Sequence, residues 1–346
     1  MSNSKIDAKI KILNYIPSKE YQESEMQILF QGKSIDNSII NALRRISLEE
    51  IPTYAFHPDT FNITYNDTVR NNDMLFKTYF CQFCIPNLKH DVVILPRKYW
   101  DGVDYKNPKR EKHSSDKKDI EIVVNVHNDT TVNMFVNTSE HLKYYEDGEL
   151  IKNKIKKDQS ELIAELRPNE TIRFSAKAVI GVNVTKGNGI FAAARSVYFE
   201  RLDEEGSKNI DEDKVDYKLV IHSLGQLSEL EIMKRSCKIL VKKLDDLKTN
   251  VHDKVKKVVD ISTRLNLDIE NESHTLGNLI QNKLQEHPKI IGASYTKRDL
   301  LVPKIQIQIE TDTKKDDPVQ ILNQVIEDLK NLFENLHDQF KKQKEI

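Results

Sequence analysis

The C-terminal segment of this chain carries the feature that most restricts its fold, an apolar stripe longer than one small sheet can cover. Asp317-Pro318 is a favourable helix start. After it, large apolar side chains recur at spacings of three and four, and they are Val319, Leu322, Ile326, Leu329, Phe333, Leu336 and Phe340. The pattern predicts a helix of about six turns with one apolar side. Such a helix needs a large partner surface, so we expect it to dock on another part of the molecule.

Strand and helix patterns alternate along the rest of the chain. A strand at 26–30 precedes a helix that we expect Ser34 to cap and Pro52 to end. The apolar stripe of this helix is Ile35, Ile39, Leu43 and Ile46. A second strand at 217–222 precedes a helix with a capping box that begins at Ser228. Its stripe is Leu227, Leu230, Met233, Cys237, Leu240, Leu244 and Leu247.

The C-terminal third repeats this order. Residues 265–269 alternate as a half-buried strand, and a helix from about 273 to 287 follows, which Pro288 ends. Strand patterns near 290–296 and 305–310 then lead to the long terminal helix. The pattern therefore predicts both strands and amphipathic helices in this third of the chain.

Composition excludes several classes of function. Lys and Arg number 53 and Asp and Glu 54, so the formal charge of -1 provides no overall field for nucleic acid or an anionic membrane. No apolar run approaches the roughly 20 residues that span a bilayer, and the first residues lack an apolar signal region. Three cysteines, an odd number, are typical of a reducing compartment. We therefore expect an intracellular protein without membrane contact.

Residues 57–174 differ from the flanking segments because they contain short strand-like runs separated by polar loops, and we expect them to form a mainly β domain. One loop, 105–113, is basic and contains one aromatic residue. We interpret it as a solvated surface loop, with contact to a phosphate backbone as the alternative. The Lys- and Asp-rich stretch 248–257 lacks a core pattern. It is the candidate linker, or else the frayed end of the preceding helix.

Two motifs in separate helices give the chain a specific resemblance. The first is Asn41-Ala42-Leu43-Arg44-Arg45-Ile46, continued by Glu50-Ile51-Pro52. It resembles the motif of the alpha-type assembly subunits of multisubunit RNA polymerases: the bacterial alpha amino-terminal domain, the archaeal D subunit and the third subunit of eukaryotic polymerase II. The second is His274-Thr275-Leu276-Gly277-Asn278-Leu279. It resembles the hallmark of their small partner, the archaeal L subunit or the eleventh subunit of polymerase II.

Further segments are similar to the same two families. The stretches from Asp73 to Pro86 and from Leu166 to Gly181 resemble the first family, and His287-Pro288 with the terminal helix resembles the second. Together the similarities cover nearly the whole chain. They imply two halves in one polypeptide, each a small sheet packed against two helices, whose helices cross to form a shared core. The implied fold is of the α+β class. It is an intrachain pseudo-heterodimer of RNA polymerase alpha-subunit-like dimerisation domains with a mainly β insert domain.

The resemblance also implies how the chain is divided. Residues 1–56 and 175–250 correspond to the alpha- or D-like dimerisation domain, which an insert domain at 57–174 interrupts. Residues 251–262 correspond to the linker and 263–346 to the L-like dimerisation domain. Fusions of this kind resemble the arrangement in large cytoplasmic DNA viruses. We therefore expect a viral protein of the host cytoplasm or virion, and otherwise a nuclear one.

The function that the resemblance implies is that of a non-catalytic assembly subunit of a DNA-directed RNA polymerase. Its paired halves would be the platform for the two largest subunits and for further small subunits, with little or no direct DNA contact. Arg44, Arg45 and Glu50 are the implied docking residues, and a guanidinium suits this role because it can hold a carboxylate through two parallel bonds. The alternative for the arginines is an intrachain salt bridge to Glu49 or Glu50.

The other motif and stripe residues are expected to build the fold. The expected intrachain dimerisation residues are Ile39, Leu43, Ile46, Leu230, Leu240, Leu276, Leu279, Leu329, Phe333 and Leu336. The motifs are completed by Asn41, Pro52, His274, Thr275, Gly277 and Asn278. Among these we expect Thr275 to start a helix, Gly277 to allow a close approach to the backbone, and His274 to cap or pack rather than to act as a base.

The cysteines raise the remaining alternatives. Many relatives carry a zinc or iron–sulfur loop in the insert, but here only Cys81 and Cys84 stand at ligand spacing, with His90 nearby, and a tetrahedral zinc site needs four ligands. We expect no metal and no cofactor. A thiol enzyme would pair Cys81 or Cys84 with His90 or His127, although no local nucleophile signature supports it. A free-standing dimerisation scaffold or transcription regulator outside a polymerase would carry the same apolar stripes.

Overall fold

The computed structural model has an α+β architecture, as the sequence predicts. It describes residues 6–17, 24–68, 72–88, 94–95, 99–100, 103–105, 118–183, 189–202, 215–255, 263–299, 302–312 and 316–343. Within these ranges, no helix is both long and apolar enough to cross a membrane.

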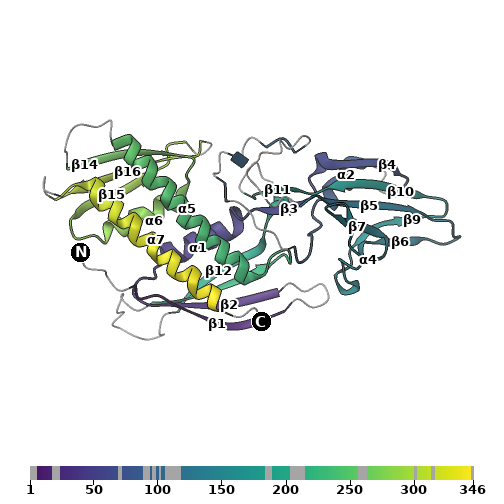
Figure 1. The fold of residues 1–346 in the computed structure, drawn as a ribbon, viewed down its shortest axis with the longest axis horizontal. Coiled ribbons are helices and arrows are strands. Elements are labelled where there is room, and N and C mark those ends of the chain that lie inside the picture. The colour runs from purple at the N-terminus through teal and green to yellow at the C-terminus, as the bar shows by residue number, and fades with distance from the viewer. Residues whose placement is uncertain are drawn as a thin grey trace.

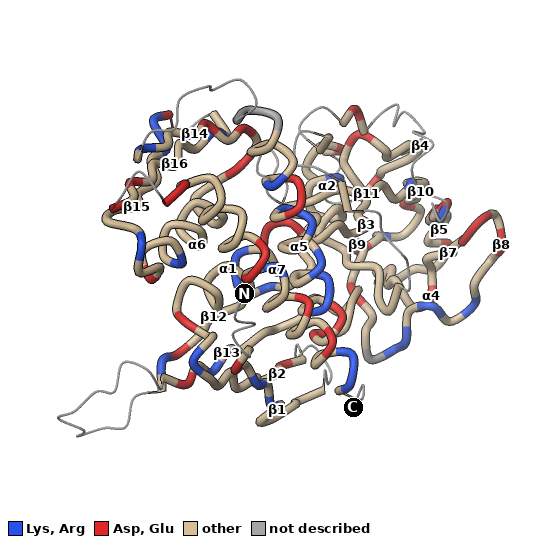
Figure 2. Tube along the Cα trace, turned by 60° about the vertical axis from the view of Figure 1, so that its left-hand side comes forward, with Lys and Arg blue, Asp and Glu red and all other residues tan. Residues whose placement is uncertain are grey.

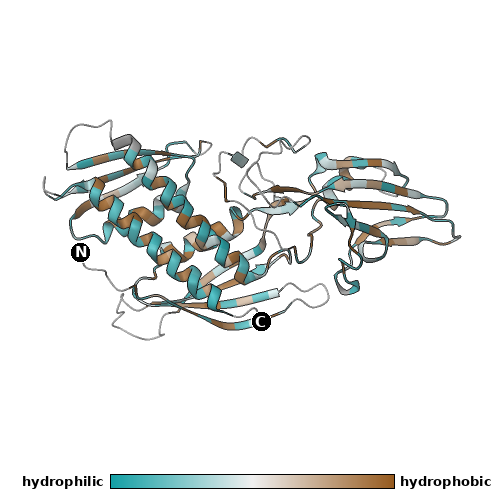
Figure 3. Cartoon of the chain, in the orientation of Figure 1, coloured by the Kyte–Doolittle hydropathy of each residue, from teal (hydrophilic) through white to brown (hydrophobic). Residues whose placement is uncertain are grey.

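The molecule is elongated, with paired helices and two sheets at one end and a separate β-rich domain at the other (Figure 1). Two long helices, α5 (Glu229–Val255) and α7 (Pro318–Lys342), run side by side in opposite directions at the first end. The antiparallel direction is seen in the ion pairs that join the helices, Lys248–Glu327 and Asp245–Lys330. Hydrophilic residues predominate on the side of both helices that faces the viewer in Figure 3.

The first half combines α1 and α5 with a four-stranded antiparallel sheet in the order β1-β2-β13-β12. Its further elements are β1 (Lys9–Ile16), β2 (Ser24–Gln31), α1 (Asn37–Glu49), β12 (Ala194–Leu202) and β13 (Asp216–Ser223). Alternate residues of β2 are buried, and Met26, Ile28 and Phe30 enter the core with the helices. The strands predicted at 26–30 and 217–222 are thus confirmed.

The second half combines α6 and α7 with a three-stranded antiparallel sheet in the order β14-β16-β15. Its further elements are β14 (Arg264–Glu270), α6 (His274–Gln285), β15 (Ile290–Thr296) and β16 (Lys304–Thr311). Ile305, Ile307 and Ile309 of β16 are buried, as their alternation predicts. Asp317 caps α7 by accepting a hydrogen bond from the backbone N–H of Val319 at 2.9 Å.

The insert has a core of its own. The strands β3 (Thr53–Ala55) and β11 (Val179–Gly181) pair where the chain enters and leaves it. It contains a five-stranded sheet in the order β4-β10-β5-β7-β8 and a two-stranded sheet of β6 and β9. Its elements are η1 (Pro58–Thr60), β4 (Phe61–Asn66), α2 (Asp73–Phe80), β5 (Ile120–His127), β6 (Met134–Asn137), α4 (Thr138–His141), β7 (Leu142–Glu146), β8 (Glu149–Leu150), η2 (Lys157–Gln159), β9 (Leu162–Leu166) and β10 (Thr171–Lys177), and η3 (Gly189–Phe191) follows β11. Phenylalanines at 56, 61, 76, 80, 83 and 174 pack together in its core.

The structure corrects the expected cap of α1. Asp36, rather than Ser34, caps this helix, because its Oδ1 accepts a hydrogen bond from the backbone N–H of Ile39 at 3.0 Å. Ser34 instead accepts a hydrogen bond from the N–H of Asp7 at 3.1 Å. The side chain of Ser34 thus binds the segment before β1, and the side chain of Asp36 caps the helix.

The ends of the insert and the linker differ in position from the expected boundaries. The strand β10 continues the insert sheet to Lys177, beyond the expected limit at 174. Helix α5 continues to Val255 and buries Val251 in the core, so the expected linker at 251–262 begins within a helix. The rest of that linker, His90 and most of the basic loop at 105–113 lie outside the described residues.

The N-terminal strand is tied to the C-terminal helix. Gln339 of α7 accepts a hydrogen bond from the N–H of Ile10 at 3.0 Å and donates one to the carbonyl of Ala8 at 2.7 Å. Its side-chain amide thereby pairs with the outer edge of β1 as a neighbouring strand would. Phe340 packs edge-on against Phe30, with ring centroids 6.2 Å apart. Contacts with α7 therefore hold the first strand of the other half.

We expect Gln339→Ala to release this edge of β1. Losing a hydrogen bond worth about 1 kcal/mol should accelerate amide exchange at Ile10 roughly fivefold. Hydrogen–deuterium exchange resolved at β1 measures this. Gln320→Ala, at an exposed position of the same helix, is the matched control and should leave β1 unchanged. Equal exchange at Ile10 in both variants would show that Gln339 does not hold the strand.

Candidate functional site

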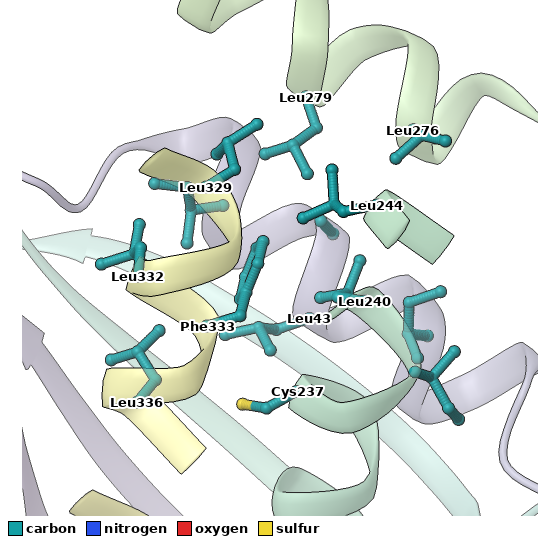
Figure 4. Packing of buried hydrophobic residues seen from close by; sticks show 14 of the residues in the cluster. Leu43, Cys237, Leu240, Leu244, Leu276, Leu279, Leu329, Leu332, Phe333 and Leu336 are labelled. Carbon is teal, nitrogen blue, oxygen red and sulfur yellow. The ribbon is translucent and has the colours of Figure 1, made fainter. Parts of the chain in front are cut away.

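One hydrophobic core joins the two halves. Helices α1 and α5 of the first half and α6 and α7 of the second all contribute to it (Figure 4). The residues that we expected to pair the halves all lie in this cluster, and none is more than 2% exposed. They are Ile39, Leu43, Ile46, Leu230, Leu240, Leu276, Leu279, Leu329, Phe333 and Leu336. Figure 4 shows labelled side chains of α1, α5, α6 and α7 gathered in this cluster, so the helices of the two halves share one apolar core.

The two sequence motifs meet across this core. Arg45 of α1 donates a hydrogen bond from Nε to Oγ1 of Thr275, at the start of α6, over 2.8 Å. Its Nη2 also forms a salt bridge of 3.2 Å with Oε2 of Glu49, one turn further along α1. The intrachain salt bridge that we considered as an alternative is therefore present. The contact with Thr275 was not foreseen, because nothing in either motif indicates that the two touch.

Arg44 is held within its own helix. Its Nε and Nη2 both donate to Oδ1 of Asn41, over 3.0 and 2.9 Å. This contact explains why the first motif carries an amide three residues before the arginine, since positions three apart lie on one helix face. Arg44 and Arg45 are both half-buried, and each guanidinium is oriented by acceptors of the chain itself.

A buried lysine links segments of both halves. Nζ of Lys243 on α5 lies 2.9 Å from a carboxylate oxygen of Glu50, just after α1, and 3.1 Å from one of Glu272, just before α6. The three side chains are between 11% and 14% exposed. Burial alone would lower the pKa of Lys243, but the two carboxylates raise it above its ordinary value, so the lysine stays charged. Glu50, one of the docking residues that the resemblance implies, pairs with Lys243 within the chain.

A second ion pair joins the halves at the opposite end of α1. Nζ of Lys283 on α6 lies 2.5 Å from Oδ2 of Asp36, the residue that caps α1. Burial would raise the pKa of Asp36, but Lys283 and the hydrogen bonds of the cap lower it overall. Figure 2 shows basic and acidic residues close to one another around α1, α5 and α7. The sequence gives only a weak signal for such pairs, namely charged residues beside the apolar stripes.

The second motif packs a glycine against an aromatic ring. A Cβ atom at Gly277 would lie 2.5 Å from Cδ2 of Tyr295, so the ring of β15 rests on the backbone of α6. The hydroxyl of Tyr295 lies 3.3 Å from Nδ1 of His274, whose ring packs edge-on against it. Asn278 is half-buried. In the first motif, Pro52 is buried at the start of β3.

The cysteines of the insert do not form a metal site with other described residues. Cys81 donates to the carbonyl of Thr78 over 3.0 Å. Burial raises the pKa of Cys81, and it raises that of Cys84 to about 12, which favours protonated thiols. Within the described ranges, no three His, Cys, Asp or Glu side chains are grouped to hold an ion. His127 bonds to the hydroxyl of Thr171 over 2.9 Å.

The fold and the junction of the motifs define a class of proteins in which two sheet-and-helix halves pair through their helices. A family model described as the RNA polymerase Rpb3/Rpb11 dimerisation domain matches residues 30–244, which is more than half of the chain. A second model with the same description matches residues 264–339. The chain therefore belongs to the RNA polymerase Rpb3/Rpb11 dimerisation domain family and to the class of DNA-directed RNA polymerase subunits.

Two relatives show how far the similarity extends. R470 of Acanthamoeba polyphaga mimivirus, a candidate DNA-directed RNA polymerase subunit, is 26% identical over 357 residues, which cover 97% of this chain and 94% of that protein. DNA-directed RNA polymerase subunit Rpo11 of Metallosphaera sedula is 40% identical over 75 residues, 22% of this chain and 82% of that protein. The resemblance inferred from the two motifs is thus confirmed.

We expect Lys243→Met to lower the free energy of unfolding by about 3–5 kcal/mol, because it leaves Glu50 and Glu272 buried without a counter-charge. Denaturant unfolding measures the loss. Lys242→Met is the matched control, since Lys242 is 49% exposed and pairs with Asp246 at the surface. Its loss should stay below about 1 kcal/mol. Similar losses in the two variants would contradict the role assigned to Lys243.

We expect Gly277→Ala to destabilise the second half. Crowding against Tyr295 costs about 1–3 kcal/mol, and a Cβ only 2.5 Å from the ring places the cost above the low end of that range and above the roughly 1 kcal/mol that alanine gains over glycine in a helix. Thermal unfolding should therefore occur at a lower temperature. Gly292→Ala in β15 is the comparison, because a Cβ there meets no atom within 4 Å. A Gly277→Ala variant as stable as Gly292→Ala would disprove the close approach.

Proposed function

We propose that this chain is a non-catalytic assembly subunit of a DNA-directed RNA polymerase, and that its paired halves form the platform on which the two largest subunits dock. The observation that carries the proposal is the single core to which α1, α5, α6 and α7 contribute within one polypeptide. A core of this kind makes the paired unit complete in one chain. The unit can then present a preformed surface to larger partners, which lowers the cost of ordering on association.

Covalent connection strengthens the pairing of the halves. A short linker replaces the encounter of two chains by an effective concentration on the order of millimolar. Even an interface of micromolar affinity would then be closed almost all the time. The platform would therefore form as soon as one chain folds, without a search for a second polypeptide.

The docking surface in this proposal centres on Arg44 and Arg45. Both guanidiniums are held by acceptors of the chain and remain partly exposed, so they can donate further hydrogen bonds to carboxylates or carbonyls of a partner. Glu50 has a structural role in this proposal. Because it pairs with Lys243 and is 11% exposed, it holds the end of α1 in place rather than touching the partner.

The remaining partners belong to the same proposal. Exposed apolar side chains on α2 of the insert, Met74 and Leu75, would contact further small polymerase subunits. The formal charge of -1 favours little direct contact with DNA, and the thiols of Cys81 and Cys84 give no reason to invoke zinc or another cofactor. The similarity to the mimivirus protein favours a viral polymerase that acts in the host cytoplasm or virion.

We expect the double variant Arg44→Glu and Arg45→Glu to fold but to lose recruitment of the large subunits, because two donors become two anions. Co-expression with the two largest subunits, followed by affinity purification through this chain, measures recruitment. The control is Lys156→Glu with Lys157→Glu, which makes the same charge change at exposed positions of the insert.

Full recruitment by the arginine variant would refute the docking role. A wild-type chain that purifies from its native source without two very large subunits would instead refute the platform itself. That second result would identify the chain as a free-standing scaffold or regulator.

A further inference from the structure

Arg45 depends on the other half of the molecule for its orientation. Its Nε donates to Thr275, whose position in the sequence is 230 residues away, and its Nη2 is held by Glu49. Thr275 is 7% exposed, whereas the Arg45 side chain is 30% exposed. The inner edge of the guanidinium therefore contacts the second half, while the part around Nη1 has no partner among the described residues.

This arrangement prepares the arginine for a planar acidic group. A free arginine side chain samples many rotamers, and fixing it on binding costs conformational entropy. Here the hydroxyl of Thr275 and the carboxylate of Glu49 already fix the side chain of Arg45 before a partner binds. The N–H groups at the outer end of the guanidinium stay available for a carboxylate. Arg44, fixed by Asn41, adds a second cation on the same helix.

Lys243 makes the hydrogen bond between Arg45 and Thr275 depend on the pairing of the halves. It binds Glu50, which follows Glu49 directly, and Glu272, which lies three residues before Thr275. One side chain thus fixes both backbone segments that carry the partners of Arg45. If the halves separated, Arg45 would lose the hydroxyl and both segments would lose their common anchor.

We propose that Thr275 is a positioning residue for Arg45, so that the docking surface for an acidic segment of a large polymerase subunit is complete only when the two halves are paired. The inference rests on the proposed function, and it adds a residue of the second half to a surface otherwise assigned to the first. The hydrogen bond from Arg45 to Thr275 would also favour assembly of correctly paired chains, because an unpaired first half presents a poorly oriented arginine and binds the partner weakly.

The test compares Thr275→Val, which keeps the shape of the side chain and removes the hydroxyl, with Thr275→Ser, which keeps the hydroxyl. Binding of each full-length chain to the co-expressed pair of largest subunits is measured in the wild-type background and in an Arg45→Ala background. We expect Thr275→Val to weaken binding about fivefold to tenfold, Thr275→Ser to bind nearly as the wild type does, and Thr275→Val to add nothing once Arg45 is alanine. Thermal unfolding of the isolated chains should show little difference between the two threonine variants.

Three results would overturn the inference. They are wild-type affinity in Thr275→Val, an equal loss in Thr275→Val and Thr275→Ser, and a loss in Thr275→Val that persists in the Arg45→Ala background. The last two would assign Thr275 to packing alone. Failure of the wild-type chain to bind the large subunits would overturn the proposed function as well, so the two failures are distinguishable.

Discussion

The pairing of α5 with α7 is the interaction on which the rest of the structure depends. Each helix carries an apolar stripe along most of its length, and neither half has a sheet large enough to cover its own stripe alone. Burying a large apolar side chain contributes roughly 1.5–3 kcal/mol, so the stripes of both helices leave water when α5 and α7 lie side by side over the shared core. The positions of α1 and α6, and hence the meeting of Arg45 with Thr275, follow from that pairing.

Charged groups at the same interface decide how the halves align. Lys243 and Lys283 each join segments of both halves through half-buried carboxylates. Such pairs add little net stability compared with apolar contacts, yet leaving one partner buried and alone is costly. A misaligned pairing would bury uncompensated charges. The apolar core therefore supplies the energy of association, and the ion pairs select one register.

Local features were predictable from the sequence, and contacts between distant segments were not. A strand was predicted from the alternation of Ile305, Ile307 and Ile309, because burial of one face repeats every second residue. A helix was predicted from Asp317-Pro318, because helix starts favour particular residues at fixed positions. The cap of α1 was misassigned because serine and aspartate both suit that role and only the preceding turn decides between them. Lys243 was missed because a lysine in an amphipathic helix has the same pattern whether it faces water or two carboxylates.

Zero-length cross-linking of lysine to carboxylate tests most directly whether the halves pair within one chain. The contacts Lys248–Glu327 and Lys330–Asp245, at 2.7 and 3.0 Å, are exposed enough to react. An equal mixture of isotopically light and heavy protein, refolded together, is cross-linked and the joined peptides are analysed by mass spectrometry. Intrachain pairing predicts joined peptides that are wholly light or wholly heavy. Joined peptides of which about half contain one light and one heavy partner would show that the halves pair between chains, and would contradict this account.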